Sequence, residues 1–197
     1  MRLWSLIVVV VLVAAMSVSV YAFDGQRKGF ILGGGIGFGM TSFTQTVEGY
    51  GQSVTSDREN KGAFMTDFKI GWAPTEQIEI YYDSKVSFLG MTNALGSDVT
   101  VANGEGGIGM SYSLNMAAPT FFFTGGLGLA TWSLPFEDNA PDTWVGFGLY
   151  GGVGYEFAKH YSAEFDIVYG NPSDSEFGID ASTSALTLKL TINALAY

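Results

Sequence analysis

The sequence predicts an all-β fold: an eight-stranded antiparallel up-and-down β-barrel that crosses a membrane, preceded by a cleavable signal peptide. Hydrophobic residues make up 47% of the 197 residues and charged residues only 14%. Yet one N-terminal segment alone approaches the roughly 20 consecutive apolar residues that a membrane helix needs. Elsewhere apolar residues alternate with polar residues or glycine, as in strands with two different faces. A closed barrel is the other structure that satisfies every backbone hydrogen bond in lipid.

Residues 1–22 are predicted to be a signal peptide. Arg2 precedes an apolar run over 6–15, and Ala22 ends a small-residue cleavage site before Phe23. An uncleaved N-terminal membrane anchor is the alternative. The barrel domain then spans 23–197, where 8 basic against 19 acidic residues give a net charge of −11. Without a basic patch, nucleic acid is not an expected partner, and without cysteine there is no disulfide or thiolate metal site.

Period-two alternation recurs in eight segments, which we expect to be the strands: 29–41, 64–72, 78–88, 100–112, 120–132, 143–157, 161–170 and 182–197. In the first, the even positions are apolar apart from Gly34, and the odd positions from Gly33 to Gly39 are glycine. The second and third show the clearest division, with charge on one face and apolar residues on the other. The last five oppose aliphatic or aromatic residues to glycine, threonine or charged residues. Only a strand places alternate residues on opposite faces in this way.

The connections between these segments alternate in length. Four are long and polar, Ser42 to Lys61, Leu89 to Asp98, Ser133 to Asp142 and Asn171 to Ala181. Three are short, Pro74 to Gln77, Ser113 to Pro119 and Ala158 to His160. Bacterial membrane barrels have an even number of strands, short periplasmic turns and longer external loops. This pattern predicts that both termini lie in the periplasm.

If the apolar positions of each strand face lipid, the alternate positions face the lumen. These inward positions hold a set of charged residues that we interpret as a lumen charge network: Asp67, Lys69, Glu79, Asp83, Lys85, Glu105, Glu156, Glu164, Asp166 and Lys189. Charges in a narrow lumen are tolerable when they are paired. Since eight-stranded barrels leave room only for side chains, we expect a polar plug that packs the interior. A gated, acidic, cation-preferring pore is the alternative.

Aromatic residues gather near the short-turn ends of the strands, where we expect a girdle at headgroup level: Phe30, Trp72, Tyr112, Phe121, Phe157, Tyr161 and Tyr197. Over 186–192 the large apolar residues occupy the even positions, whereas Leu195 and Tyr197 stand at odd positions. This change predicts a bulge or an early strand end near Asn193.

The alternating strands, the Trp72-Ala73-Pro74 turn, the stretch 152–157 (GVGYEF) and the terminal Tyr197 resemble the small OmpA/OmpX-type outer-membrane barrels. The resemblance covers the whole barrel domain, although its motifs are generic to the class. It implies residence in the outer membrane of a Gram-negative cell envelope and contact with outer-membrane lipids and lipopolysaccharide. It also implies delivery by periplasmic chaperones to the barrel-assembly machinery, which reads an aromatic last residue. We expect a monomer.

Many functions share this scaffold, so the fold alone does not choose among them. We expect a non-enzymatic protein with an envelope-structural or surface-interaction (adhesion) role, and no cofactor. A porin-like channel for small solutes or hydrophobic compounds is the alternative. The acidic loop residues Glu137, Asp138 and Asp142 could bind a divalent cation, but they lack the spacing of a known calcium loop, so we expect solvated loops and no metal.

A lipid A-modifying enzyme is the third hypothesis. His160 and Ser162 form an H-x-S pair that resembles the one in the lipid A deacylase barrels, and Glu164 could complete a triad. We expect an ordinary turn histidine instead, because Ser162 points inward by parity, away from lipid. Two G-x-G-x-x-G matches, at 104–109 and 146–151, lie inside strands and open no helix, which excludes a dinucleotide site.

Overall fold

A computed structural model describes residues 26–92, 96–137, 140–176 and 178–197. The predicted signal peptide, 1–22, and loop residues 138–139 lie outside these ranges. No helix among the described residues has the length and apolar character needed to cross a membrane.

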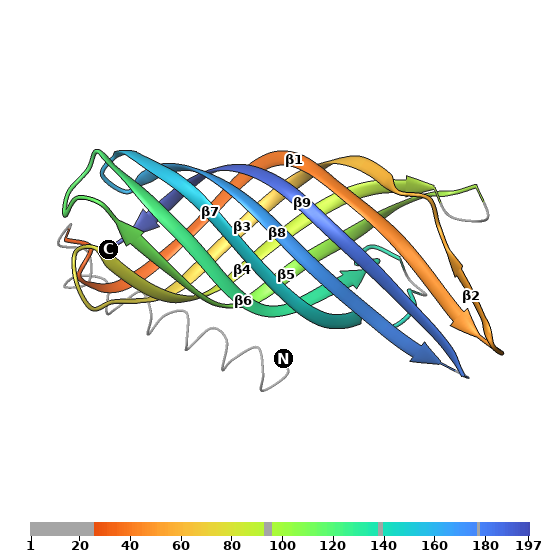
Figure 1. Ribbon diagram of the computed structural model, residues 1–197. Coiled ribbons are helices and arrows are strands. Elements are labelled where there is room, and N and C mark those ends of the chain that lie inside the picture. The colour runs from red at the N-terminus through yellow and green to blue at the C-terminus, as the bar shows by residue number, and fades with distance from the viewer. Residues whose placement is uncertain (1–25, 93–95, 138–139, 177) are drawn as a thin grey trace, which may run out of the picture.

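Nine strands follow one another along the chain; eight of them lie where the alternation predicts strands, and the short second strand lies in the predicted loop from Ser42 to Lys61. They are β1 (Gly29–Gly49), β2 (Gln52–Thr55), β3 (Glu59–Ala73), β4 (Ile78–Thr92), β5 (Asp98–Ser113), β6 (Thr120–Ser133), β7 (Trp144–Ala158), β8 (Tyr161–Glu176) and β9 (Ile179–Ala196). Each of β3 to β8 pairs antiparallel with the next strand, and β1 pairs with both β3 and β9. Eight strands therefore close a barrel, and β2 is an added hairpin partner of β1 (Figure 1).

The two faces of the wall differ along every strand. In β4 the odd positions are buried from Glu79 to Leu89, whereas the even positions are exposed or half-buried. The exposed positions form an apolar belt around the barrel, and its residues on β1 include Ile36, 63% exposed, and Phe38, 71% exposed. A soluble protein would not expose so large an apolar surface, but lipid would cover it.

Several strands are longer than the sequence pattern predicts. β1 runs on to Gly49, into the predicted loop from Ser42, and β8 and β9 take up most of the predicted loop 171–181. Past Met40 on β1 and Tyr169 on β8 the outward residues become polar, so these strands continue beyond the belt. A transmembrane strand needs only about 9–11 residues.

These extensions continue the sheet of the barrel wall, and we call the projecting part, residues 41–49, 52–55, 170–176 and 179–185, the outer sheet. It projects at the end of the barrel with the longer connections, the loop end, opposite the C-terminus and the short turns of the turn end (Figure 1). The sheet order β2-β1-β9-β8 joins its four segments.

The predicted bulge near Asn193 is wrong. The β1–β9 register is unbroken from Gly49↔Ile179 to Leu32↔Ala196, so strict alternation turns Leu195 and Tyr197 inward. The wall has its irregularity elsewhere, between Glu156 and Ala158 in the β7–β8 pair.

Candidate functional site: the barrel lumen

The structure places all ten charged residues of the predicted set inside the barrel, each at most 7% exposed. Six of them connect through ion pairs, and we call these the charge network: Asp67, Lys69, Lys85, Glu164, Asp166 and Lys189. The network joins β3 and β4 to β8 and β9 across the lumen.

Lys85 is the centre of the charge network. Its Nζ lies 2.8 Å from Glu164 Oε1, 2.7 Å from Asp166 Oδ2 and 3.7 Å from Asp67 Oδ1. Lys69 Nζ bonds the other oxygen of Glu164 at 2.6 Å. Such pairs offset the desolvation cost of burial only when hydrogen bonds satisfy both partners, and here two ammonium groups share one carboxylate.

The remaining contacts of the charge network are made by Asp67. Lys189 Nζ lies 2.5 Å from Asp67 Oδ1 and also donates to the carbonyl of Thr66 at 2.7 Å. The hydroxyl of Thr191 donates to Asp67 Oδ2 at 2.9 Å. Tyrosine rings complete the surroundings, since Lys85 Nζ lies 4.5 Å from the ring centre of Tyr150.

Three carboxylates of the network could in principle bind a metal ion. Asp67, Glu164 and Asp166 bring one oxygen each within 4.8 Å of one another. Lys85 makes an ion pair with all three, so its ammonium group is the cation of this cluster.

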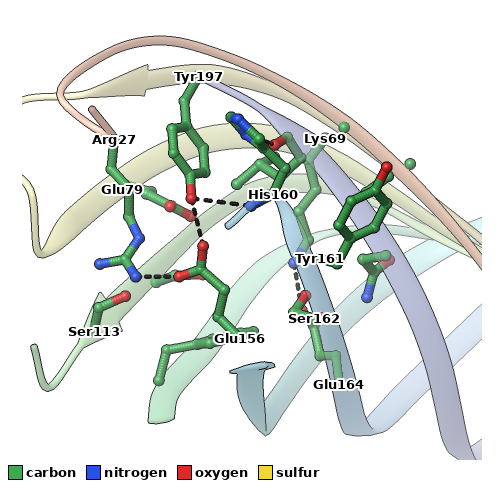
Figure 2. Close-up of a pocket in the computed structure, with 17 residues that line it drawn as sticks. Arg27, Lys69, Glu79, Ser113, Glu156, His160, Tyr161, Ser162, Glu164 and Tyr197 are labelled. Atoms are coloured by element: carbon green, nitrogen blue, oxygen red, sulfur yellow. Dashed lines mark hydrogen bonds and ion pairs between the residues drawn. The ribbon is translucent and has the colours of Figure 1, made fainter. Parts of the chain in front are cut away.

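A second polar cluster closes the turn end, and we call it the mouth cluster: Arg27, Glu156, His160 and Tyr197. Arg27 makes an ion pair with Glu156 and donates to the carbonyls of Glu76 and Asn115 at 3.1 and 2.9 Å. The Tyr197 hydroxyl donates to Glu156 and accepts from the backbone N–H of His160 (Figure 2). Burial and the bond to Glu156 raise the pKa of Tyr197, which follows the last residue of β9, to about 12.

The mouth cluster corrects one part of the predicted aromatic girdle. Tyr197 is 3% exposed and faces the lumen, because the alternation of β9 runs unbroken to its end. Its assignment to the outward face is therefore wrong. The other predicted members lie on the outer surface of the barrel, half-buried or exposed: Phe30, Trp72, Tyr112, Phe121, Phe157 and Tyr161.

A cavity of about 40 Å³ lies against the mouth cluster, and Lys69, Glu79 and Glu164 also line it (Figure 2). One ordered water needs about 10–15 Å³ of such space, so the cavity has room for about three. The sequence analysis missed Arg27, which precedes the first strand. Its odd number continues the inward parity of β1, and that was the available signal.

Two residues of the enzyme hypothesis, His160 and Glu164, have other partners. His160 Nδ1 lies 2.9 Å from the carbonyl oxygen of Leu195, and its ring packs on Tyr197. Glu164 bonds Lys69 and Lys85. In a triad the histidine must instead hydrogen-bond both the nucleophile and the orienting acid.

The loop end of the lumen is apolar. Seven buried residues form an apolar plug: Phe43, Ala63, Met65, Leu89, Val101, Trp132 and Ala185. The rings of Phe43 and Trp132 lie 5.1 Å apart across it. An apolar lumen at this end was not predicted from the sequence, because the first predicted strand stopped at Thr41, before Phe43.

No family model matches this chain, and no curated protein matches it. Among solved structures it is similar to the outer membrane protein OprG from Pseudomonas aeruginosa, with a TM-score of 0.52 and 10% identity over 89% of this chain and 99% of that one. It is also similar to Neisserial surface protein A, with a TM-score of 0.50 and 11% identity over 85% and 97% of the two chains. Ail, the attachment invasion locus protein of Yersinia pestis, matches with a TM-score of 0.39 and 12% identity over 84% and 99%.

The matches to OprG and to Neisserial surface protein A cover nearly the whole of both chains. They agree with the eight-stranded ring and with the apolar belt on its outer surface. This chain therefore has the fold of the small eight-stranded outer-membrane β-barrels.

Proposed function

We propose that this chain is exported by residues 1–22 and that residues 23–197 act in the outer membrane as a non-enzymatic anchor for a surface-interaction site. The loop end then faces the cell exterior and the turn end the periplasm. Lipids and lipopolysaccharide cover the apolar belt, and periplasmic chaperones and the barrel-assembly machinery insert the chain as a monomer.

The observation that supports an anchor is the filled lumen. The mouth cluster, the charge network and the apolar plug follow one another from the turn end to the loop end, and apart from the half-buried His160 their side chains are buried. An interior packed in this way supports the wall, as in other eight-stranded barrels.

The outer sheet is the surface that this anchor would present. Its outward positions are mostly small and polar, including Ser42, Thr44 and Thr46 on β1. At its tip Tyr50 is 89% exposed, and Val54 on β2 is 69% exposed. Exposed aromatic and hydroxyl-bearing side chains on a rigid support are well suited to contact another macromolecule.

The test is to shorten the β1–β2 hairpin by replacing residues 44–58 with a two-residue Asn-Gly turn, which keeps Phe43 paired with Glu59. We expect loss of cell adhesion, while the protein still shows the heat-modifiable gel migration of a folded barrel. A matched variant shortens the β6–β7 connection, 134–142, and should keep adhesion. Unchanged adhesion with increased detergent sensitivity would instead favour the envelope-structural role.

The second candidate is a channel for hydrophobic compounds, which one observation favours. A largely apolar pocket of about 210 Å³ lies at the loop end, lined by Met91, Trp132, Leu134 and Trp144 among others. Trp132 belongs to the apolar plug, where its ring packs on Phe43. If this is an entrance, Trp132→Ala should increase uptake of an apolar dye into vesicles.

A small-solute pore predicts a different result. Planar bilayers would show step conductance that falls in Glu79→Gln or Asp83→Asn. If planar bilayers show no conductance and Trp132→Ala leaves dye uptake unchanged, the anchor remains as the function.

A further inference from the structure

The lumen contains more buried acid than base. Among the described residues, seven buried carboxylates oppose four buried basic groups, an excess of three negative charges. Each basic group has an acidic partner: Arg27 pairs with Glu156, Lys69 with Glu164, Lys189 with Asp67, and Lys85 with several. The carboxylates left without an ion-pair partner are Glu79, Asp83 and Glu105. A buried charge without compensation costs several kcal/mol, so something must offset it.

Lysines lie beside two of these acids but bond elsewhere. The strand register places Lys69 directly opposite Asp83, and Lys85 directly opposite Glu105. Residues in such positions have Cβ atoms about 4.5–5.5 Å apart, close enough for an ion pair. Both ammonium groups instead extend across the lumen to Glu164 and Asp166 on β8.

Asp83 and Glu105 are consequently isolated together. They are 0% and 2% exposed, and none of their four carboxylate oxygens has a hydrogen-bond partner in the protein. Asp83 pairs with Gly107, two residues along β5 from Glu105, so the two side chains are diagonal neighbours on the inward face. They are close enough to repel each other electrostatically. Glu79 differs from them because it lines the cavity beside the mouth cluster, which has room for water.

The wall around this acid pair is shaped by glycine. A Cβ atom on Gly148 would lie 2.8 Å from Cγ of Glu105, and one on Gly109 would lie 3.0 Å from Oδ2 of Asp83. Larger residues at either position would displace the carboxylates. The same Cβ on Gly109 would meet the Tyr150 hydroxyl, which places a neutral oxygen beside Asp83.

We propose that Asp83 and Glu105 together bind a divalent metal cation inside the lumen. Their two negative charges match one such ion, and carboxylate oxygens together with waters are ligands that Ca²⁺ and Mg²⁺ prefer. The Tyr150 hydroxyl and retained waters complete the coordination. The site differs from the Asp67–Glu164–Asp166 cluster, whose cation is Lys85. It is independent of any partner at the outer sheet, so its failure would leave the proposed function untouched.

The experiment uses the mature barrel refolded in detergent and stripped of metal with EDTA. Calorimetric titration with CaCl₂ and with MgCl₂ should give one saturable site. Tb³⁺, a luminescent substitute for Ca²⁺, should respond to tyrosine excitation, because Tyr150 lies beside the site. The double variant Asp83→Asn/Glu105→Gln should weaken binding by at least about tenfold, the effect that even indirect metal partners produce.

A matched control separates the lumen from the loops. Glu48→Gln/Asp57→Asn makes the same charge change at two exposed positions and should bind as wild type. If the control loses binding and the lumen variant keeps it, the cation sits on the loops and the proposal is wrong. The proposal is equally wrong if the wild type binds none of the three ions.

One further measurement covers the case in which the double variant does not fold. Ca²⁺ should raise the Tm of the wild-type barrel relative to EDTA, a result that needs no substitution. Infrared spectra of the EDTA-treated and the Ca²⁺-loaded wild type would also reveal a protonated carboxylic acid. If that band is present and unchanged by Ca²⁺, protons neutralise the acids, and the metal site is refuted.

Discussion

The side chains of the charge network and of the apolar plug both point into the lumen, yet different interactions stabilise them there. Lys85, 2% exposed, is stabilised by three carboxylates, whereas Phe43, 1% exposed, is stabilised by packing against Trp132. The difference follows depth along the barrel. The apolar belt surrounds the charge network. Around the plug the outward residues of β1 are already polar, at Ser42 and Thr44, although Phe64 on β3 still faces outward.

The comparison teaches that the alternation along a strand determines which residues face the lumen, but not whether they must be charged or apolar. A polar network must be complete, since each unpaired buried charge is costly, while an apolar plug tolerates imperfect partners. Removing one member should therefore harm the network more than the plug. Four predictions test this contrast, from the largest effect to the smallest.

Lys85→Met should produce the largest loss. It keeps the length of the side chain but leaves Asp166 without its ammonium partner and Glu164 with only one. We expect the free energy of unfolding in lipid vesicles to fall by about 3–5 kcal/mol. The control is Lys61→Met, whose pair with Glu59 is 3.4 Å long and largely exposed, and which should cost less than about 1 kcal/mol. Equal losses would show that the network contributes no more than a surface pair.

Phe43→Ala should cost about 3 kcal/mol, because it opens a cavity in the apolar plug. Urea titration of the refolded barrel measures the change. Phe136→Ala provides the comparison, since Phe136 is 71% exposed and its loss should change stability by about 0.5 kcal/mol or less. A larger loss for Phe43→Ala than for Lys85→Met would reverse the proposed order of the two regions.

The sequence predicted the wall of the barrel better than its contents. Alternation located eight strands and turned Asp83, Glu105 and Lys189 inward, because a strand leaves no other choice. It ended β1 too early, since beyond Met40 the outward residues are polar and resemble a loop. The apolar plug was missed for that reason, as Phe43 fell outside the predicted strand.

The partners inside the lumen could not be predicted from parity. Lys69 stands opposite Asp83 in the sheet, but its ammonium bonds Glu164 on β8. That choice depends on the stagger and tilt of the closed barrel, which no single strand encodes. Tyr197 was misplaced for a related reason, because a bulge was expected where the register is regular.

Tyr197→Phe should have an intermediate effect, because it removes the hydroxyl that bonds Glu156 and the N–H of His160. Leaving Glu156 with Arg27 alone should cost about 2 kcal/mol, the scale of a hydrogen bond to a charged group. Tyr161→Phe, at a side chain 52% exposed on the outer surface, should cost about 0.5 kcal/mol or less. Chemical denaturation of both variants checks the difference. Identical midpoints would mean that the mouth cluster does not stabilise the barrel.

Tyr50→Asn should have the smallest effect, and of opposite sign. Tyr50 and Gly51 form the two-residue turn between β1 and β2, with φ angles of 50° and 75°. A turn with both φ angles positive favours Asn-Gly, because asparagine tolerates the left-handed region better than tyrosine does. We expect the free energy of unfolding to rise by about 0.5 kcal/mol.

The same substitution tests why tyrosine occupies that turn. A residue that strains the backbone and is 89% exposed contributes little to folding, so its benefit must lie outside the barrel. If Tyr50→Asn stabilises the protein and weakens adhesion, the outer sheet holds a contact residue retained at a cost in stability. If adhesion is unchanged, the contact surface lies elsewhere on the loop end, and the strain at Tyr50 has no part in it.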